Sequence, residues 1–396
     1  MSLLEIVFWL LVGVVAYTYV GYPLLLGLLA WLRPRPVKRG PGGPRSCSII
    51  LCVRNEEVHI DRRLTELTAL LEATGVVGEI IVVSDGSTDA TATLARDHTK
   101  GPVRVLELPD NVGKAAALSA GCAMATDEVL VFADARQRWA PDALAMLLEN
   151  FADPEVGAAT GGLVIESAAG TLAGVGLYWR FEKWLRHQES RVWSMVGATG
   201  AISAVRRELF RPIPAGTDLD DVYWPLQVAL LGKRVVLDPR ARAYDRLPDR
   251  VRDEFRRKVR TLSGNFQLLG RLPQVLLPWR CPIWFSVLSH KVLRLVVPWA
   301  LVAIFVLSAA LPAALYQGLF WAQFAGYAVG VAGALSPALA RFKPVSAAAS
   351  FVVLNAAAWL GFWVWITGGT ARSWSKVDYQ RLPNVPAREQ ARAAAS

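Results

Sequence analysis

The sequence predicts an α/β domain with a parallel sheet, fastened to a membrane by helices on both sides. Residues 6–32, 295–340 and 344–371 contain no charged side chain, and roughly 20 apolar residues can cross a bilayer as a helix. Between the first two runs, short β-branched stretches alternate with helical ones, as in parallel α/β sheets. With 53% hydrophobic residues and a formal net charge of +10, the chain is neither a fully soluble enzyme, nor a secreted disulfide scaffold, nor a disordered chain.

The first apolar run, at residues 6–32, is expected to stay in place as a membrane anchor. The flank before it carries no positive charge, and the run is longer than the apolar core of a signal peptide. Basic residues follow it directly, with no acidic residue among them, which favours the cytoplasmic side. We therefore expect a multi-pass protein of the cell's inner membrane with its large domain in the cytoplasm. The basic flank comprises Arg33, Arg35, Lys38, Arg39 and Arg45.

The second apolar block is too long for one crossing, and prolines divide it. We expect crossings near 292–311, 314–336 and 346–367, which makes four with the first helix. Four crossings place both termini outside, whereas basic residues after position 371 favour a cytoplasmic tail, and the sequence leaves this conflict open. The expected domains are a membrane helix at 1–33, an α/β domain at 34–280 with interfacial helices, membrane helices at 281–370 and a basic tail at 371–396.

The positive net charge does not indicate nucleic acid, because the chain contains no nucleic-acid-binding motif. Membrane-proximal or phosphate-binding roles account for the basic residues better. The cysteines form no CxxC pair and the histidines show no spacing typical of a zinc site. A cytosolic domain would keep these cysteines reduced.

Two aspartates follow predicted strands. Ligands of parallel α/β sheets bind beyond the carboxyl ends of the strands, so Asp85 and Asp134 are candidates for a binding site. Asp85 alone could equally be a helix N-cap. Lys114 precedes a predicted helix whose amino terminus could hold an anion, but Ala115 stands where a Walker A motif needs Ser or Thr. The predicted strands span 47–53, 79–84, 103–108 and 128–132, and the predicted helices end near 72 and span 88–98 and 115–125.

Eight short motifs follow one another along the chain, and their order and spacing are more informative than any one of them. They are VRNEE at 53–57, IVVSDGSTD at 81–89, NVGKA at 111–115, FADAR at 132–136, GATGA at 197–201, RRELF at 206–210, TDLDD at 217–221 and GKRVV at 232–236. Together they resemble membrane-bound family 2 glycosyltransferases, which include the hyaluronan, chitin-oligosaccharide and cellulose synthases. The resemblance runs from about residue 46 to 269 and extends to the flanking membrane helices. It implies a GT-A, Rossmann-like domain that binds a nucleotide-sugar.

The resemblance also implies roles for particular residues. Asp85 would contact the nucleotide, and Asp134, the first acid of the DxD motif, would bind the donor and Mg²⁺ or Mn²⁺. Asp221 matches the general base better than Asp220 does, because the apolar residues after it then fit the family pattern. A solvated acidic loop that includes Asp218 is the alternative. Further residues expected at the nucleotide-sugar are Arg54, Asn55, Glu56, Lys114 and Arg136, and at the diphosphate or acceptor Asp220, Thr199, Gly200, Arg257 and Arg260.

These residue types suit the transfer of a sugar. A sugar hydroxyl becomes a good nucleophile only when a positioned carboxylate removes its proton. The departing nucleoside diphosphate develops negative charge, which a metal ion, Lys or Arg must stabilise. One carboxylate opposite one leaving group implies a single displacement with inversion at the anomeric carbon.

Two motifs depart from the family pattern. Arg136 stands where the DxD motif ends in a metal-binding acid, and a guanidinium has no lone pair to donate. Either Asp134 holds the metal with other groups or Arg136 replaces part of its charge, so we expect weaker metal dependence than in relatives. In the QxxRW motif of processive members, Arg257 and Thr261 replace the glutamine and the tryptophan, while Arg260 is retained. Losing the tryptophan removes a stacking platform for an acceptor sugar, which favours one or few additions.

Two amphipathic segments accompany these motifs. One combines an apolar stripe with a basic row of Arg252, Arg256 and Arg260, which repel one another unless they face anions such as a diphosphate or acidic lipid head groups. A solvated basic face is the alternative. Residues 172–193 suit a helix in the membrane interface, and a packed helix of the domain fits nearly as well.

The sequence therefore predicts a membrane-embedded, inverting glycosyltransferase with a nucleotide-diphospho-sugar donor, UDP-linked by preference. Its acceptor would be a glycan or a lipid-linked molecule of the cell envelope or of an exopolysaccharide. One rival is a polyprenyl-phosphate glycosyltransferase, whose acceptor needs no general base. Another is an inactive nucleotide-sugar-binding subunit of a polysaccharide export complex. A transporter is disfavoured, because the charge-free runs hold no acid or base to mark an ion pathway.

Overall fold

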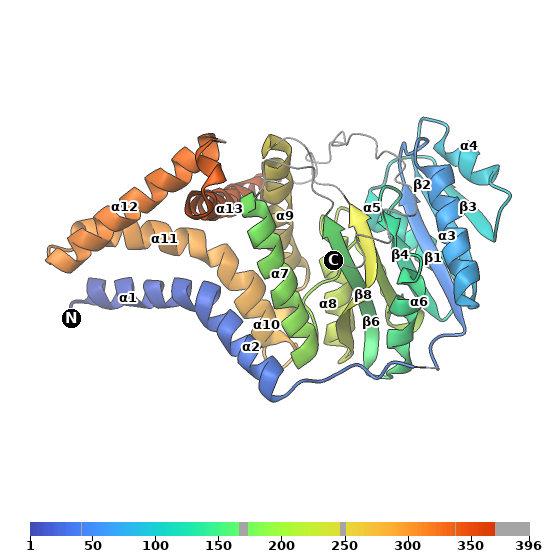
Figure 1. Cartoon of the computed structure of the whole chain (residues 1–396), viewed down its shortest axis with the longest axis horizontal. Helices are drawn as coiled ribbons and strands as arrows, with labels where there is room; N and C mark the ends of the chain where they lie inside the picture. Colours follow the sequence, from blue (N-terminus) through green and yellow to red (C-terminus); the bar gives the residue numbers. More distant parts are fainter. Residues whose placement is uncertain (41, 166–172, 246–250, 337, 369–396) are drawn as a thin grey trace.

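The computed structural model describes residues 1–40, 42–165, 173–245, 251–336 and 338–368. A sheet and its covering helices form one end of the molecule, and apolar helices form the other (Figure 1). Two long helices, α7 (Ala173–Val192) and α9 (Val251–Arg271), stand between these ends. The predicted basic tail at residues 371–396 lies outside the described residues.

The sheet has the strand order β3-β2-β1-β4-β7-β6-β8-β5. The first half is parallel, as predicted, since β1 pairs in parallel with β2 and β4, and β2 with β3. In contrast, β7 is antiparallel to β4 and β6, and β5 is antiparallel to β8. The strands are β1 (Ser46–Val53), β2 (Val77–Asp85), β3 (Val103–Leu108), β4 (Val129–Ala133), β5 (Arg138–Trp139), β6 (Val156–Ile165), β7 (Ile202–Arg206) and β8 (Arg234–Asp245).

β7, which is not among the four predicted strands, runs antiparallel to its neighbours for a local reason. After α7, the backbone N–H of Met195 donates to the carbonyl of Val235 near the start of β8. Five residues later, Gly200 lies beside Lys114 at the opposite end of the sheet. The segment between them carries the chain back to the carboxyl ends of the parallel strands, so β7 must run the other way.

Hydrophobic cores cover both faces of the sheet. In β1, Ile49 and Leu51 belong to the core that includes α3 and α6, whereas Ile50 belongs to the core that includes α5 and α8. Successive side chains of a strand point to opposite faces, so a strand buried on both faces is apolar throughout. The helices are α3 (Ile60–Thr74), α4 (Thr91–Arg96), α5 (Lys114–Met124), α6 (Ala143–Leu148) and α8 (Asp220–Leu230).

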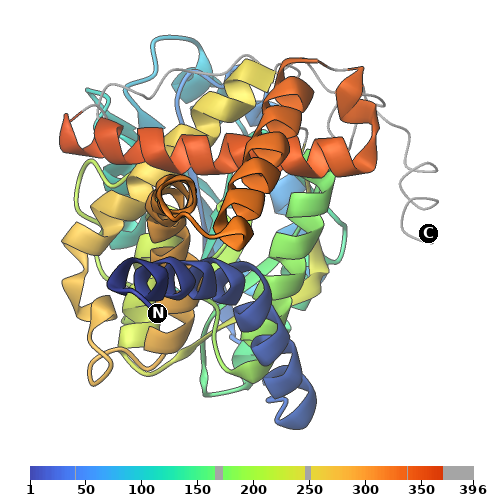
Figure 2. The same cartoon turned by 90° about the vertical axis from the view of Figure 1, so that its left-hand side faces the viewer.

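Four helices in the described part of the chain are long and apolar enough to cross a membrane. Large apolar side chains such as Leu10, Trp31 and Trp321 are exposed on them, as expected of surfaces that face lipid. Figure 2 turns this helical end toward the viewer, and α13 packs against α12, α9 and α7. The spans are Leu3–Leu32 (α1, a π-helical turn and α2), Trp284–Ala310 (α10, a π-helical turn and α11), Ala314–Leu335 (α12) and Lys343–Ile366 (α13).

The second of these helices differs from its prediction. It begins at Trp284 rather than near residue 292 and therefore includes His290, Lys291 and Arg294. The charge-free run from residue 295 contains no acid or base, but the first part of this helix does. The charge-free run in the sequence marks only the part of the helix beyond these side chains.

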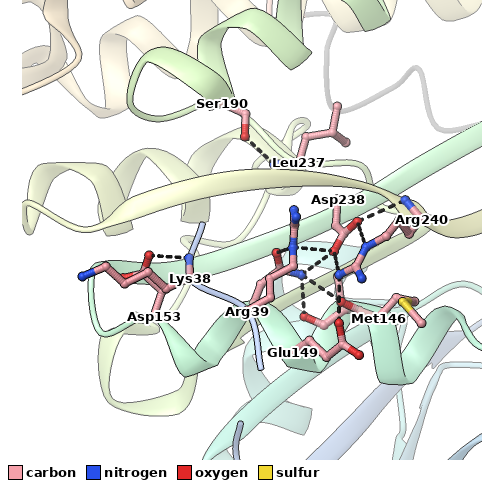
Figure 3. A network of polar contacts seen from close by, with 11 residues as sticks. Lys38, Arg39, Met146, Glu149, Asp153, Ser190, Leu237, Asp238 and Arg240 are labelled. Atoms are coloured by element: carbon pink, nitrogen blue, oxygen red, sulfur yellow. Dashed lines mark hydrogen bonds and ion pairs between the residues drawn. The ribbon is translucent and has the colours of Figure 1, made fainter. Parts of the chain in front are cut away.

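Polar contacts tie the segment between α2 (Tyr22–Leu32) and β1 to the α/β domain (Figure 3). The backbone N–H of Lys38 donates to Oδ2 of Asp153 at 3.1 Å. Nε of Arg39 lies 3.2 Å from Oδ2 of Asp238, whose side chain is fully buried. Arg39, one of the basic residues that suggest a cytoplasmic flank, thus also holds this linker against the α/β domain.

Candidate active site

Asp85, the last residue of β2, fixes the loop that precedes α5. Its Oδ1 accepts from the N–H of Val112 at 2.7 Å, and its Oδ2 accepts from the N–H of Gly113 at 3.0 Å. The next residue, Gly86, has a φ of 59°, and a Cβ there would lie 2.5 Å from a backbone nitrogen of the same loop, so the turn requires glycine. Asp85 therefore does not cap the helix after its own strand and instead positions the loop that carries Lys114.

Lys114 joins carboxylates from two elements. Its Nζ lies 2.8 Å from Oδ1 of Asp134, directly after β4, and 3.9 Å from Oδ2 of Asp220, in the first turn of α8. Burial alone would lower the pKa of Lys114, but Asp134, Asp220 and Asp221 outweigh burial and raise it. Lys114 is therefore a stable cation among three carboxylates.

Gly200 leaves space at the centre of this cluster. A Cβ at this position would lie 3.3 Å from Nζ of Lys114 and 4.0 Å from Cβ of Asp221. The backbone N–H of Ala198 donates to the carbonyl of Asp221 at 2.8 Å, which holds the loop against the start of α8. The segment that reverses β7 thus also completes the site.

The acidic residues at the start of α8 are not a solvated loop. Burial raises the pKa of Asp220 to about 6, Lys114 opposes this shift, and two neighbouring carboxylates add to it. Burial likewise raises the pKa of Asp218, against the attraction of Arg260 and a second arginine. Since both shifts arise from burial, the alternative of a purely solvated acidic face is not supported.

Arg136, which stands where the DxD motif has its last acid, pairs with Asp245, the last residue of β8. Its Nη2 donates to Oδ2 of Asp245 at 3.3 Å, and Nε2 of Gln137 donates to the same oxygen at 3.0 Å. Among the described residues, no group of three or more His, Cys, Asp or Glu side chains could hold a metal ion. Asp134 can offer one oxygen on the side of Gly200. A divalent cation therefore fits only with oxygens from a bound diphosphate, as is usual for Mg²⁺.

A single cleft of about 1940 Å³ joins these groups. The carboxyl ends of the strands line one side of it, and α7, α9 and α13 line the other. Their chemical roles stay predictions, but every predicted site residue lines this cleft. They are Arg54, Asn55, Glu56, Asp85, Lys114, Asp134, Arg136, Thr199, Gly200, Asp220, Asp221, Arg257 and Arg260.

α9 has one side on the membrane helices and another on the cleft. Phe266 packs edge-on against Phe362 of α13, with ring centroids 5.3 Å apart, while Arg256 and Arg260 line the cleft. The apolar stripe and the basic row are thus separate, as predicted. The side chain of Arg252 lies outside the described residues.

Position 261 offers no stacking surface. Oγ1 of Thr261 donates to the carbonyl of Arg257 in its own helix at 2.9 Å. The nearby ring of Trp179 already faces cations, since the guanidinium carbon of Arg257 lies 6.0 Å and Nζ of Lys258 lies 5.2 Å from its centroid. An acceptor sugar therefore gains no aromatic platform from Thr261.

A second charged network, which sequence reasoning missed, lies buried where α7 meets the membrane helices. Nδ1 of His290 is 2.7 Å from Oε1 of Glu189, and its Nε2 is 2.9 Å from Oε1 of Glu182. Tyr22 donates to Glu189 at 3.0 Å, and Arg294 donates to Glu182 at 2.8 Å. These five residues are called the Glu182–His290 network below.

The sequence did contain one signal for this network. Glu182 and Glu189 stand two helical turns apart, on the same face as Leu185, which is fully buried. Burial would raise the pKa of Glu182, but His290 and Arg294 outweigh it and hold that pKa well below its usual range. α7 packs against α2, α13 and β8, which fits the packed-helix interpretation of residues 172–193.

The mixed sheet, the aspartates after β2 and β4 and the acidic start of α8 around one cleft define the GT-A class of glycosyltransferases. Residues 48–213 match the model of Glycosyl transferase family 2. The chain thus carries a domain of this family, and the resemblance noted in the sequence is confirmed for these residues.

The fold extends this likeness to most of the chain. The mannosyltransferase PcManGT from Pyrobaculum calidifontis, solved in complex with GDP-Man and Mn²⁺, aligns with a TM-score of 0.67 and 25% sequence identity. The alignment covers 92% of this chain and 99% of that one. The arrangement of flanking helices is therefore shared along with the GT-A domain.

Curated relatives match over shorter stretches. Poly-beta-1,6-N-acetyl-D-glucosamine synthase of Staphylococcus aureus (strain COL) is 27% identical over 236 residues, which is 57% of this chain and 55% of the synthase. Dolichyl-phosphate beta-glucosyltransferase of Drosophila melanogaster is 41% identical over 97 residues, 22% of this chain and 30% of that protein. The chain thus matches about half of the synthase and about a third of the glucosyltransferase.

Proposed function

We propose that this protein is an inverting, membrane-embedded glycosyltransferase that moves a sugar from a UDP-linked donor to a glycan or lipid-linked acceptor. The single observation that carries the proposal is the shared cleft. It contains Lys114 with its three carboxylates at one end, and it continues to α13, one of the helices that can cross a membrane. An acceptor approaching from the membrane would meet a donor held at the strand ends.

The arrangement supports a single displacement. Asp221 takes the proton of an acceptor hydroxyl, and the hydroxyl oxygen forms a bond to the anomeric carbon. The bond between that carbon and the diphosphate oxygen breaks, and its electron pair leaves with the nucleoside diphosphate. Lys114 and Arg260 supply positive charge for the leaving group, and attack from the opposite face inverts the anomeric carbon.

The donor is tested with the purified full chain. UDP-glucose, UDP-N-acetylglucosamine, UDP-galactose and GDP-mannose are offered in turn, and release of nucleoside diphosphate is measured. We expect release from a UDP-sugar. Release from GDP-mannose alone would refute the UDP preference, and release from none would favour the inactive-subunit rival.

We propose that metal dependence is weaker than in relatives with a complete DxD motif. When bound, a divalent cation would add charge that stabilises the leaving diphosphate, and Asp134 would be its protein ligand. In excess EDTA we expect a residual rate, because Lys114 already provides a cation beside Asp134. Complete loss of activity that Mg²⁺ restores contradicts this proposal.

The same proposal places residues 34–280 in the cytoplasm, between the membrane helices at 1–33 and 281–370. It is supported by the basic flank after the first helix. Lys100 is exposed on the α/β domain, so Lys100→Cys should react with a membrane-impermeant thiol reagent in inverted vesicles and not in intact cells. Labelling in intact cells would reverse the orientation.

A phosphate acceptor is the rival that the basic side chains of the cleft favour. Phosphate oxygens are already ionised and need no general base, so Asp221→Asn would then change the rate little. A large loss in this variant favours a hydroxyl as the attacking group.

A further inference from the structure

A buried arginine interrupts the apolar face of α3. Ile60, Leu64 and Leu67 of this helix are fully buried in the core beside the sheet, and Arg63, almost one turn after Ile60, is buried with them. Its Nη1 pairs with Oε1 of Glu66 at 3.0 Å, and its Nη2 has no hydrogen-bond partner among the described residues. A buried charge with an unmade hydrogen bond costs stability, and apolar residues of similar volume would fill this space at a lower cost. Stability alone therefore does not account for Arg63.

Arg63 and its neighbour Arg62 hold the backbone of the DxD motif. Nε of Arg63 donates to the carbonyl of Asp134 at 3.0 Å. Nη2 of Arg62 donates to the carbonyls of Ala135 at 3.1 Å and Arg136 at 3.3 Å. All three carbonyls of the motif thus accept hydrogen bonds from α3. Asp134 itself lines the cleft, so α3 fixes the backbone of a motif whose first acid belongs to the candidate active site.

Trp139 of β5 carries this contact on to the residue directly before β7. The guanidinium carbon of Arg63 lies 4.8 Å from the centroid of the Trp139 ring, and the backbone N–H of Trp139 donates to Oε1 of Glu66. Nε1 of Trp139 donates to the carbonyl of Ala201 at 2.9 Å, in a buried hydrogen bond. We call Arg63, Glu66 and Trp139 the clamp, because together they join the DxD motif to the start of β7.

Both segments that the clamp joins adjoin the candidate active site. Gly200 precedes Ala201, and a Cβ on Gly200 would lie 3.9 Å from Oδ2 of Asp134 and 4.0 Å from Cβ of Asp221. The space between Asp134 and Asp221 is therefore bounded by two segments that the clamp connects. The residues of the clamp are not among those that line the cleft in the described part of the chain, so they can act only through the segments they hold.

We propose that Arg63 and Trp139 are positioning residues for sugar transfer, which hold the DxD motif and the loop at 197–201 at a fixed separation. This inference rests on the proposed function and extends it to residues behind the active site. Because Arg136 replaces the last acid of the motif, Asp134 is its one carboxylate, and the clamp sets where the backbone of Asp134 lies. A misplacement of about 1 Å far from the chemistry can lower a rate about 10²-fold.

Trp139→Phe tests the clamp with little change in shape, because it keeps a ring beside Arg63 and removes only the N–H that Ala201 accepts. We expect kcat to fall at least about tenfold, because the loop at 197–201 loses its attachment. The donor KM and the affinity for UDP should change less than about twofold, since Asp85 and the loop after β2 remain in place. Initial rates are measured below the melting transition of each variant, where a loss of stability alone leaves kcat unchanged.

Trp284→Phe is the matched control. Nε1 of Trp284 also donates to a backbone carbonyl at 2.9 Å, that of Leu276, so the same atoms are lost. Trp284 is not among the residues that line the cleft in the described part of the chain. We therefore expect kcat of this variant to stay within about twofold of that of the unaltered protein.

A second variant tests whether the clamp acts as one unit. Arg63→Lys keeps the charge, but one ammonium group cannot replace the planar guanidinium that reaches both Asp134 and Glu66. We expect kcat to fall in this variant too. The double variant with Trp139→Phe should lose little more than the more strongly affected single variant, because both changes break the same connection. Losses that multiply fully in the double variant would contradict a single clamp.

Amide hydrogen exchange tests the clamp without any substrate. In Trp139→Phe we expect the amides of residues 197–201 to exchange at least about tenfold faster, because the carbonyl of Ala201 has lost its donor, while the amides of β2 keep their rates. Unchanged exchange at 197–201, equal kcat in Trp139→Phe and Trp284→Phe, or a loss of UDP affinity as large as the loss of kcat overturns the inference. Failure of the unaltered protein to use any donor would overturn the proposed function instead, and the exchange result would still decide whether the clamp holds the loop.

Discussion

Two charged clusters of this protein are buried in different ways. At the strand ends, Lys114 is surrounded by three carboxylates, and burial together with neighbouring negative charge raises the pKa of Asp220 to about 6. In the Glu182–His290 network, cations and carboxylates pair closely, and the pKa of Glu182 is lowered. Both clusters line the same cleft, so burial and access to the cleft do not separate them, whereas the unbalanced charge at the strand ends makes that cluster the candidate active site.

The largest expected effect separates the clusters by activity. Asp221→Asn removes the proposed base but keeps the shape of the side chain, so kcat should fall about 10³-fold. Release of nucleoside diphosphate in the presence of acceptor measures this. Binding of UDP should stay unchanged, because Asp85 and the loop after β2 remain.

Asp218→Asn is the matched control, since Asp218 lies in the same acidic stretch and lines the same cleft. We expect the logarithm of kcat to fall in Asp218→Asn by at most a tenth of its fall in Asp221→Asn. Comparable losses in the two variants would mean that charge in the region, and not one positioned base, supports the reaction.

The next effect concerns stability. Glu182→Gln removes the carboxylate that pairs with Arg294 and with Nε2 of His290, while Glu189 still contacts Nδ1 of His290, and the loss of this buried charge costs about 3 kcal/mol. We expect the Tm of the detergent-solubilised protein to fall by roughly 5–10 °C. UDP binding by the folded protein should persist. Glu107→Gln, in a pair that is largely exposed, is the control, and an unchanged Tm in the Glu182 variant would contradict a structural role for the network.

Lys114 and its three carboxylates, Asp134, Asp220 and Asp221, form the strand-end cluster. Here we expect the loss of a carboxylate to raise the Tm rather than lower it. Because the folded-state pKa of Asp220, about 6, exceeds the usual value for aspartate, the group favours folding below about pH 4 and loses this contribution as pH rises through 6. Asp220→Asn removes this loss and should raise the Tm at neutral pH by a few degrees. Melting curves from pH 4 to 8 test this, and a Tm that falls as in the Glu182 variant would show that the site carries no electrostatic strain.

The same two clusters show what the sequence could predict. Asp85, Asp134 and Asp221 were found because each follows a recognisable strand or motif, and the carboxyl ends of parallel strands meet at one edge. The four apolar helices were equally visible, because length and composition alone define them. These features depend on neighbours in the chain.

Other features depend on packing between distant segments. Asp245 opposite Arg136 and His290 between Glu182 and Glu189 join residues roughly a hundred positions apart, and no local period encodes such pairs. The return of the chain before β7 is likewise set by contacts of residues 195–200 with β8 and Lys114. Sequence reasoning therefore found the carboxylates at the strand ends and missed the Glu182–His290 network.

The smallest expected effect tests whether exposure to water decides the cost of losing a charge. Arg39 also pairs with a buried carboxylate, but its side chain is 33% exposed, and Asp238 keeps its contacts with Arg240 and Asn150. Arg39→Ala should therefore cost at most about 1 kcal/mol, whereas Asp238→Ala, which leaves Arg39 and Arg240 without their common partner, should cost more. Melting curves of both variants beside Glu182→Gln give the ranking. If Arg39→Ala were as costly as Glu182→Gln, the linker contacts would belong to the core of the fold, and solvent access would not explain the difference between the two buried clusters.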